Sequence, residues 1–186
     1  MTRLPVAYLA GPDLFLPDAH AHAARKVAIA AGHGIEALVP LDAPAPERQP
    51  GEALWQAIFR QDVGMMEASD IIIAHLTPFR GASADAGTLV ELGWFLGRRR
   101  PCFGYSNAST PFAARSRRQI AALPDPVSDI AVEDFGLGDN LMVVGALEGG
   151  LVTPPEGQDL PFDSFTMFER CVARAAAFLA GRSPPG

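Results

Sequence analysis

The segment that decides the fold is Asp70-Ile-Ile-Ile-Ala-His-Leu76, followed by Arg80-Gly-Ala-Ser-Ala-Asp-Ala-Gly-Thr-Leu-Val-Glu-Leu-Gly93. The first part is an apolar run of strand length, and the second begins with small residues typical of a loop before a helix. A loop between a parallel strand and the next helix lies at the carboxyl edge of the sheet, where open α/β folds bind ligands. Asp85 and Glu91 therefore become candidate site residues.

Each of these two carboxylates also has an ordinary structural interpretation. Thr88-Leu-Val-Glu91 fits a capping box, in which Glu91 would bond back to the backbone at the start of the helix. Asp85 could be a loop residue that bonds its own turn. The segment by itself leaves both interpretations open.

Composition restricts the class of protein. The chain has 186 residues, of which 48% are hydrophobic and 19% charged, so it is long enough to bury a core and too apolar to be disordered. A net charge of -6 argues against a nucleic-acid polymer as partner. The two cysteines are distant from each other and suggest neither a disulfide nor zinc. No apolar run has the length of a membrane span and no signal peptide is expected, so we predict a cytoplasmic protein.

The rest of the chain alternates between predicted strands and helices. Strands are expected at Val6–Ala10, Ile35–Val39, Ile71–Leu76, Pro101–Tyr105 and Leu141–Leu147. Helices are expected at 19–31, 52–69, 88–99, 111–123 and 162–180. This order predicts a single doubly wound α/β domain over residues 1–180, with a five-stranded parallel sheet of flavodoxin-like type, helices on both faces and a frayed tail at 181–186.

Two further residues are candidates for the chemistry. Asp62 belongs to a helical stripe with Leu54, Ile58 and Met65, so its carboxyl should be partly buried and its pKa raised, as a general acid requires. The alternative is an aspartate that faces solvent or a neighbouring loop. Tyr8 is expected to direct its phenol toward the carboxyl edge of the sheet, where it could bond a carboxylate or be an ordinary buried tyrosine.

Several other site classes lose support. The motifs GxSxG, GxxxxGK[ST] and GxGxxG are absent, so the sequence does not suggest a serine hydrolase, a P-loop protein or a Rossmann dinucleotide site. The four histidines lack metal-ligand spacing, and His75 is expected to be a core or strand-end residue. A cluster of arginines is expected to form a solvated helix face: Arg115, Arg117 and Arg118.

An ordered set of short motifs resembles the nucleoside 2-deoxyribosyltransferase family across about residues 5–180. The motifs are Tyr8-Leu-Ala-Gly-Pro12, Asp62 eight residues before Asp70, Pro78-Phe-Arg-Gly81, Asp85-Ala-Gly-Thr88, Glu91-Leu-Gly93, Phe135-Gly-Leu-Gly-Asp-Asn-Leu-Met142 and Phe162-Asp-Ser-Phe165. No single motif is specific, but their order is. Compared with the family, this sequence looks long at 40–51 and 105–134.

The resemblance implies a role for each matching residue. Glu91 would be the nucleophile that attacks C1′ of a 2′-deoxynucleoside, and Asp62 would protonate the leaving base and deprotonate the incoming one. Tyr8 would position Glu91, and Asp85 would accept a hydrogen bond from the sugar 5′-OH. Asn140 would reach that hydroxyl from a neighbouring subunit, which implies a homo-oligomer.

The resemblance also implies the binding partners. Gly11, Phe15 and Met142 would contact a substrate that is a purine or pyrimidine 2′-deoxynucleoside or a free nucleobase. Neither a cofactor nor a metal is expected, because carboxylates alone can perform the transfer.

Two rival functions remain. A nucleoside 5′-monophosphate N-glycosidase would hydrolyse its substrate, but Asp85, Asp13 and Asp18 would be expected to repel a phosphate. A non-catalytic nucleoside-binding module would keep the fold but would not need Asp62, Asp85 and Glu91 together.

Overall fold

The chain is organised around a parallel sheet. The computed structural model describes residues 3–42, 44–125 and 129–181. Its four strands, β1 (Val6–Ala10), β2 (Glu36–Leu38), β3 (Ile71–His75) and β4 (Cys102–Tyr105), lie in the order β2-β1-β3-β4 and all pair in parallel. Four of the predicted strands are therefore present, with ends that shift by no more than one residue.

The fifth predicted strand is wrong. Leu141–Leu147 contains the short helix α5 (Leu141–Gly145), which begins where the Asn140 side chain accepts a hydrogen bond from the Met142 backbone N–H. Beyond β4, the described residues extend the sheet only by an isolated parallel bridge between Tyr105 and Val152. A short apolar run has no periodicity of its own, and the side-chain cap at Asn140 favours the helix.

Helices connect and cover the strands. Their bounds are η1 (Pro12–Phe15), α1 (Ala19–Gly32), η2 (Pro40–Asp42), α2 (Leu54–Ala68), α3 (Ala86–Gly97), α4 (Phe112–Ala121) and α6 (Thr166–Gly181). The predicted helices are therefore present, and α6 begins four residues later than expected. Of the tail predicted at 181–186, only Gly181 lies within the described residues. None of the described helices combines the length and apolar character needed to cross a bilayer.

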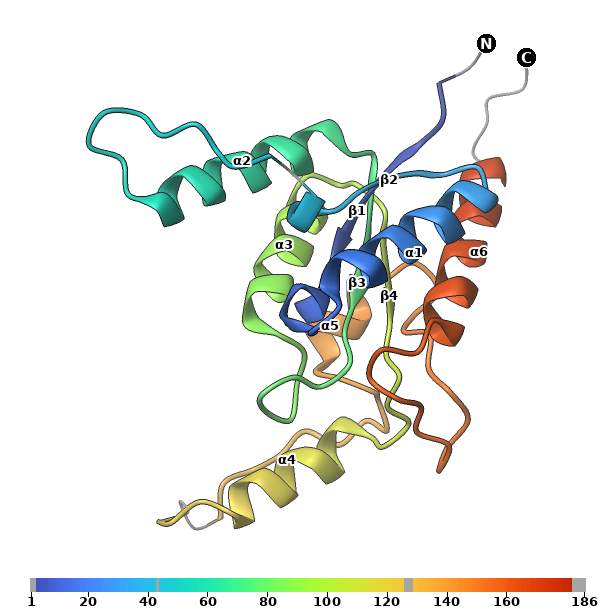
Figure 1. The fold of residues 1–186 in the computed structure, drawn as a ribbon. Helices are drawn as coiled ribbons and strands as arrows, with labels where there is room; N and C mark the ends of the chain where they lie inside the picture. The colour runs from blue at the N-terminus through green and yellow to red at the C-terminus, as the bar shows by residue number, and fades with distance from the viewer. Residues whose placement is uncertain (1–2, 43, 126–128, 182–186) are drawn as a thin grey trace.

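The sheet separates two apolar cores. Alternate residues of β1 point to opposite faces, so Ala7 and Leu9 pack with α1 and α6, whereas Tyr8 and Ala10 pack with α2, α3 and α5. Figure 1 shows α1 and α6 on one side of the strands and α3 on the other. Because both faces are covered, all five residues of β1 and of β3 are buried.

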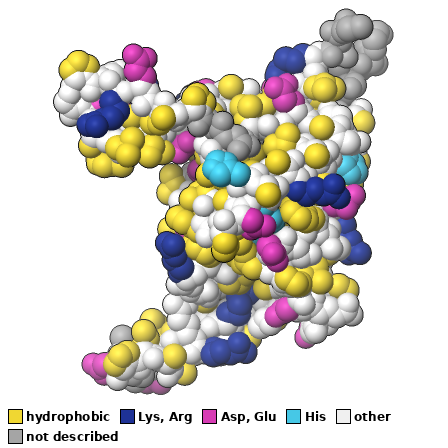
Figure 2. All heavy atoms as spheres, in the orientation of Figure 1, with side chains coloured by type: hydrophobic (Ala, Val, Ile, Leu, Met, Phe, Trp, Pro, Cys, Tyr) yellow, Lys and Arg dark blue, Asp and Glu magenta, His cyan; other side chains and the backbone are white. Residues whose placement is uncertain are grey.

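The N-terminal part of α2 extends away from the sheet together with the loop before it (Figure 1). The expected buried stripe on this helix is therefore only partly buried, since Leu54 and Ile58 are exposed. Trp55 and Phe59 are also exposed, and Figure 2 shows hydrophobic side chains gathered on this projecting segment. An apolar group of this size on a projecting helix is typical of a surface that contacts another protein.

Candidate active site

A cavity of about 250 Å³ opens at the carboxyl edge of the sheet. It is lined by the end of β1, by η1 and α1, by residues 39–41 after β2, and by one side each of α2 and α3. This is the edge at which doubly wound folds bind ligands, and the volume suits a molecule somewhat smaller than a drug-sized ligand. Five of the predicted site residues line the cavity: Gly11, Phe15, Asp62, Asp85 and Glu91.

Glu91 is fixed by Tyr8. The Tyr8 hydroxyl donates a hydrogen bond of 2.7 Å to Glu91 Oε1, across the contact between β1 and α3. Burial raises the pKa of Glu91 to about 7; the Tyr8 bond opposes this shift, and the charges of Asp62 and Asp85 add to it. No cation among the described residues forms an ion pair with Glu91. The bond to Tyr8 occupies one oxygen and leaves Oε2 for contact with a ligand.

The tyrosine remains a hydrogen-bond donor. Burial, with the neighbouring Glu91 charge, raises the pKa of Tyr8 well above its ordinary value, so the phenol keeps its proton at neutral pH. Tyr8 does not line the cavity itself; it lies behind Glu91 in the core between β1 and α3.

The capping-box interpretation of Glu91 is wrong. Helix α3 begins at Ala86 with Asp85 as its N-cap, so Thr88 is already inside the helix and Glu91 lies in the second turn. In a capping box the Glu91 side chain would accept a hydrogen bond from the Thr88 backbone N–H, whereas here Glu91 accepts one from the Tyr8 hydroxyl.

Asp85 does bond its own turn, as the structural interpretation allowed. Its Oδ2 accepts hydrogen bonds from the Thr88 backbone N–H at 3.2 Å and from the Thr88 hydroxyl at 3.4 Å. Asp85 also lines the cavity. The two interpretations are therefore compatible, because a carboxylate has about four acceptor positions and the helix uses only those of one oxygen.

Asp62 reaches the cavity from the middle of α2. Its side chain is partly buried, and burial raises the pKa of its carboxyl, as the sequence predicted. Asp62 is close enough to Glu91 for its charge to raise the pKa of Glu91. Both carboxyl groups have pKa values above the ordinary ones, so acid catalysis and nucleophilic attack become possible in one site.

Gly11 and Phe15 shape the mouth of the cavity. A Cβ at Gly11 would lie 2.6 Å from the Cβ of His75, and the backbone φ of 150° also requires glycine. Phe15 is 53% exposed and stacks on Phe79, with ring centroids 5.6 Å apart. The Arg80 guanidinium lies 4.6 Å from the centroids of both rings, so the stack is fixed from one side.

No sequence pattern predicted the polar cluster around Asp13. Lys26 donates a 2.6 Å hydrogen bond to Asp13 Oδ2, and His75 Nδ1 lies 2.7 Å from Oδ1. His22 Nε2 lies 3.4 Å from the same Oδ1. Burial acts to raise the pKa of Asp13, but Lys26 and the two histidines outweigh it and keep the pKa far below its ordinary value. The described residues hold no group of three or more His, Cys, Asp or Glu arranged for a metal ion.

His75 in this cluster is a buried, neutral histidine. Burial lowers its pKa despite the neighbouring Asp13. Thr77 Oγ1 accepts a 2.8 Å bond from the Asn107 N–H and lies 2.6 Å from His75 Nε2, so the Thr77 hydroxyl can donate to that nitrogen. The Nδ1–H of His75 then donates to Asp13. His75 is thus a buried strand-end residue, as expected, with a defined polar role.

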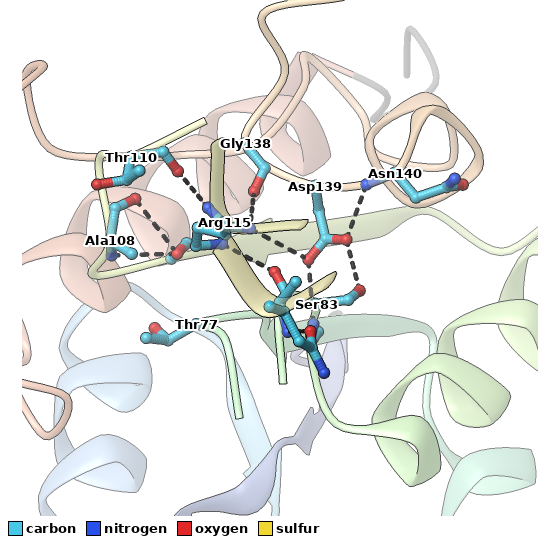
Figure 3. A network of polar contacts seen from close by, with 12 residues as sticks. Thr77, Ser83, Ala108, Thr110, Arg115, Gly138, Asp139 and Asn140 are labelled. Carbon is cyan, nitrogen blue, oxygen red and sulfur yellow. Dashed lines mark hydrogen bonds and ion pairs between the residues drawn. The ribbon is translucent and has the colours of Figure 1, made fainter. Parts of the chain in front are cut away.

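Asn140 and Met142 do not line the cavity of their own chain. The Asn140 side chain caps α5 and donates a 2.8 Å bond to Glu133, and Met142 is 67% exposed. In the neighbouring network of Figure 3, buried Asp139 accepts bonds from the Ser83 hydroxyl and the Ala84 N–H.

Arg115 completes this network, so the expectation that it belongs to a solvated face is wrong. Its guanidinium donates to the carbonyls of Thr110, Ala82 and Gly138 and lies 4.0 Å from Asp139. Arg115 and Asp139 together tie the loop before Asp85 to the segment that contains Asn140. The loop that places Asp85 in the cavity is therefore fixed from outside.

Comparisons with known proteins agree with this arrangement. Residues 7–142 match a family described as "Nucleoside 2-deoxyribosyltransferase". An uncharacterized protein of Schizosaccharomyces pombe is 32% identical over 124 residues, which cover 64% of this chain and 59% of that protein. The chain thus spans about three fifths of the length of this curated relative.

Two solved structures are similar to the chain over most of its length. One is "2-desoxiribosyltransferase from Leishmania mexicana", with a TM-score of 0.64 and 28% identity over 93% of this chain and 97% of that chain. The other is a conserved protein from Enterococcus faecalis V583, with a TM-score of 0.57 and 20% identity over 93% of this chain and 99% of that chain. The second similarity supports the fold alone.

Proposed function

The chain belongs to the nucleoside 2-deoxyribosyltransferase family, and we propose that it transfers 2-deoxyribose between nucleobases through a covalent intermediate on Glu91. The observation that carries the proposal is a cavity-lining glutamate with no cationic partner among the described residues, positioned by the Tyr8 hydroxyl at 2.7 Å. A pKa of about 7 leaves a large fraction of Glu91 ionised near neutral pH. The substrates are 2′-deoxynucleosides and free nucleobases.

In the first half-reaction the free oxygen of Glu91, Oε2, attacks C1′ of the nucleoside. The C1′–N bond breaks, its electron pair goes to the base nitrogen, and Asp62 donates a proton to the base. In the second half-reaction an incoming base attacks C1′ and gives a proton to Asp62, and the bond from C1′ to Glu91 breaks. Two displacements retain the configuration at C1′, as in retaining glycosidases. Water in place of the second base gives slow hydrolysis.

Tyr8 would assist both displacements by its bond to Oε1. A donor at that oxygen fixes the rotation of the carboxylate and directs the other oxygen toward the cavity. The same bond lowers the basicity of Glu91, so the glutamate is a better leaving group in the second half-reaction. Asp85 would accept a hydrogen bond from the 5′-OH with the oxygen that does not cap α3.

This assignment favours free nucleosides over 5′-monophosphates, although for fewer reasons than the sequence suggested. Asp13 is neutralised by Lys26, and Asp18 is exposed and does not line the cavity. The repulsion of a phosphate therefore depends on Asp85. The N-terminus of α3 would by itself favour a phosphate, whereas the carboxylate of Asp85 at that N-terminus would repel one.

We further propose a homo-oligomer in which Asn140 completes the site of a neighbouring subunit. Asn140 lies beside exposed Leu141 and Met142 and does not reach its own cavity, and the projecting end of α2 exposes Trp55 at 68%. A second copy that covers these surfaces would bury them without any change in the fold. Light scattering, with activity measured upon dilution, tests this proposal: a fully active monomer would contradict it.

The test of the function is a base-exchange assay with deoxyinosine and a second free base. A transferase produces the new deoxynucleoside, whereas a hydrolase produces only free deoxyribose and base, and a binding module produces neither. Matched reactions with deoxyinosine 5′-monophosphate distinguish the N-glycosidase. Preference for the monophosphate would overturn the proposed function.

A further inference from the structure

The cavity contains a buried ion pair, Asp13 and Lys26, that the proposed transfer chemistry does not use. The Lys26 ammonium lies 2.6 Å from Asp13 Oδ2, and the two side chains are 3% and 13% exposed. Lys26 is the only lysine of the chain, since all the other Lys and Arg residues, which number 15 together with it, are arginines. A buried ion pair gives little net stability compared with apolar residues, so stability alone does not account for its presence beside a cavity.

Contacts within the protein leave this pair with more unused hydrogen-bond donors than unused acceptor positions. An ammonium has three N–H groups, and the hydrogen bonds of the described residues use one of them, to Asp13. Asp13 has about four acceptor positions, and Lys26, His75 and His22 approach three of them. Rings also fix the ammonium, with the centroids of Phe168 and Tyr105 at 4.7 and 5.5 Å. The pair therefore presents fixed donors beside a single acceptor.

The walls around this pair are apolar and would suit a flat ring. Leu9, Ala19, Ala23, Val39 and Leu41 line the same cavity. Apart from the three carboxylates assigned to the sugar and to the reaction, Asp13 and Lys26 are the charged side chains that line it among the described residues. If a nucleobase buries its polar edge between these apolar walls, Asp13 and Lys26 are the charged groups that can bond to that edge.

We propose that Lys26 and Asp13 select bases that carry a carbonyl beside a ring N–H, namely 6-oxopurines or 4-oxopyrimidines, over their amino counterparts. This inference rests on the proposed function and specifies its substrate class. Lys26 can only donate, so it matches a carbonyl oxygen, and in a purine also N7. Asp13 as a carboxylate can only accept, so it matches the ring N–H. In an amino base, the amino group would face the Lys26 ammonium, which is also a donor. The unprotonated ring nitrogen would face the Asp13 carboxylate, which is also an acceptor, so buried polar groups would stay unpaired.

Turnover of matched nucleosides tests the selection directly. Hypoxanthine and adenine differ in shape very little, so the ratio of kcat/KM for deoxyinosine to deoxyadenosine isolates the recognised edge. We expect this ratio to be at least about tenfold, as for one well-placed hydrogen-bonded contact. The same comparison of deoxyuridine with deoxycytidine separates a purine site from a pyrimidine site.

The variant Lys26→Met distinguishes recognition from support of the fold. It removes the donors and keeps the aliphatic stem, so the ratio should fall toward one, chiefly through a loss with deoxyinosine. A lysine that only held η1 in place would lower both activities by the same factor and leave the ratio unchanged. Arg98→Met, which changes an exposed cation on the opposite end of α3, is the matched control.

The single lysine also allows a measurement that needs no variant. In protein made with ¹³C-labelled lysine, only Lys26 gives side-chain signals. These should shift upon addition of hypoxanthine or uracil, and much less with the matching amino base, adenine or cytosine. Equal shifts within both pairs, a larger shift with an amino base, or no shift with any of the four bases would overturn the inference. A shift selective for the oxo base, without base exchange, would support recognition by Lys26 and contradict the transferase. The failure of the inference and the failure of the proposed function are therefore distinguishable.

Discussion

Glu91 and Asp13 are two largely buried carboxylates that line one cavity, and their electrostatic surroundings are opposite. Glu91 has a neutral donor, Tyr8, and two neighbouring carboxyls, and its pKa is raised to about 7. Asp13 has a lysine and two histidines, and its pKa is held far below its ordinary range. Burial by itself acts to raise the pKa of both groups.

The comparison shows that the partner of a buried carboxylate determines what the carboxylate can do. A carboxylate paired with a cation is ionised and fixed, so it suits recognition, whereas one without a cation exchanges protons and can attack carbon. The cavity therefore has one region suited to chemistry and one suited to binding. The following predictions test that division.

The largest effect is expected when Glu91, the proposed nucleophile, is replaced. Glu91→Gln keeps the shape of the side chain and an acceptor for Tyr8, but an amide oxygen is a poor nucleophile. We expect base exchange and hydrolysis to fall at least about a thousandfold, or about 4 kcal/mol in the activation barrier. Steady-state rates with deoxyinosine measure this loss. Glu156→Gln, on an exposed loop, is the control. A Glu91→Gln enzyme with a rate within about tenfold of the wild-type rate would contradict the role of Glu91 in the chemistry.

The second effect concerns Asp85, the carboxylate that caps α3. Asp85→Ser keeps a capping oxygen but removes the charge at the proposed position of the sugar 5′-OH, so activity should fall with the nucleoside and rise with its 5′-monophosphate. Two unit charges about 4 Å apart repel by about 4 kcal/mol at an effective dielectric of 20, so the shift in preference is at most roughly a thousandfold. The measurement is kcat/KM for both substrates in the wild type and in Asp85→Ser. An unchanged preference would mean that Asp85 does not contact the 5′ end of the substrate.

The third effect concerns Asp62, whose raised pKa suits a proton donor. Asp62→Asn cannot donate a proton in the same way, and we expect a loss of roughly a hundredfold with bases that leave poorly. Nucleosides with activated leaving bases should be affected far less. A leaving-group series in both enzymes measures the difference. Equal losses across the series would assign Asp62 to positioning of the base.

The smallest effect is on stability, and its sign follows from the raised pKa of Glu91. A carboxyl whose pKa rises from 4.5 to about 7 on folding disfavours the folded state progressively as pH increases between these values. Glu91→Gln should therefore increase the free energy of unfolding by about 2 kcal/mol at pH 8 and hardly at all at pH 4, allowing for water in the cavity. Urea unfolding at both pH values measures it. Stabilisation of equal size at pH 4 would mean that packing, not ionisation, is responsible.

The sequence predicted the positions of Asp62, Asp85 and Glu91 better than the cluster around Asp13. Asp85 and Glu91 lie in the loop and helix that follow a predicted strand, so the topology brings them to one sheet edge. Asp62 lies in the middle of a predicted helix and was indicated by its position in an apolar stripe. Asp13, Lys26 and His75 have no common spacing, and their contacts depend on how η1 and α1 pack on β3. The one available signal was that Lys26 is the only lysine in a chain otherwise rich in arginine.

The errors in the predicted fold have local causes. The run at Leu141–Leu147 has β-branched residues and the length of a strand, but the Asn140 cap converts its start into α5. The capping box at Thr88 failed because Asp85, three residues earlier, is the stronger N-cap and starts α3 at Ala86. In both cases a side-chain cap determined the structure where the hydrophobic pattern was ambiguous.

The most direct test of the central claim is to identify the residue that carries the sugar. The enzyme would be mixed with deoxyinosine in the absence of an acceptor base, quenched with acid within one turnover and digested for mass spectrometry. We predict that the peptide with Glu91 gains the mass of one deoxyribosyl group and loses it when an acceptor base is added before the quench. A deoxyribosyl group on another peptide, or base exchange with no adduct on any, would contradict the account.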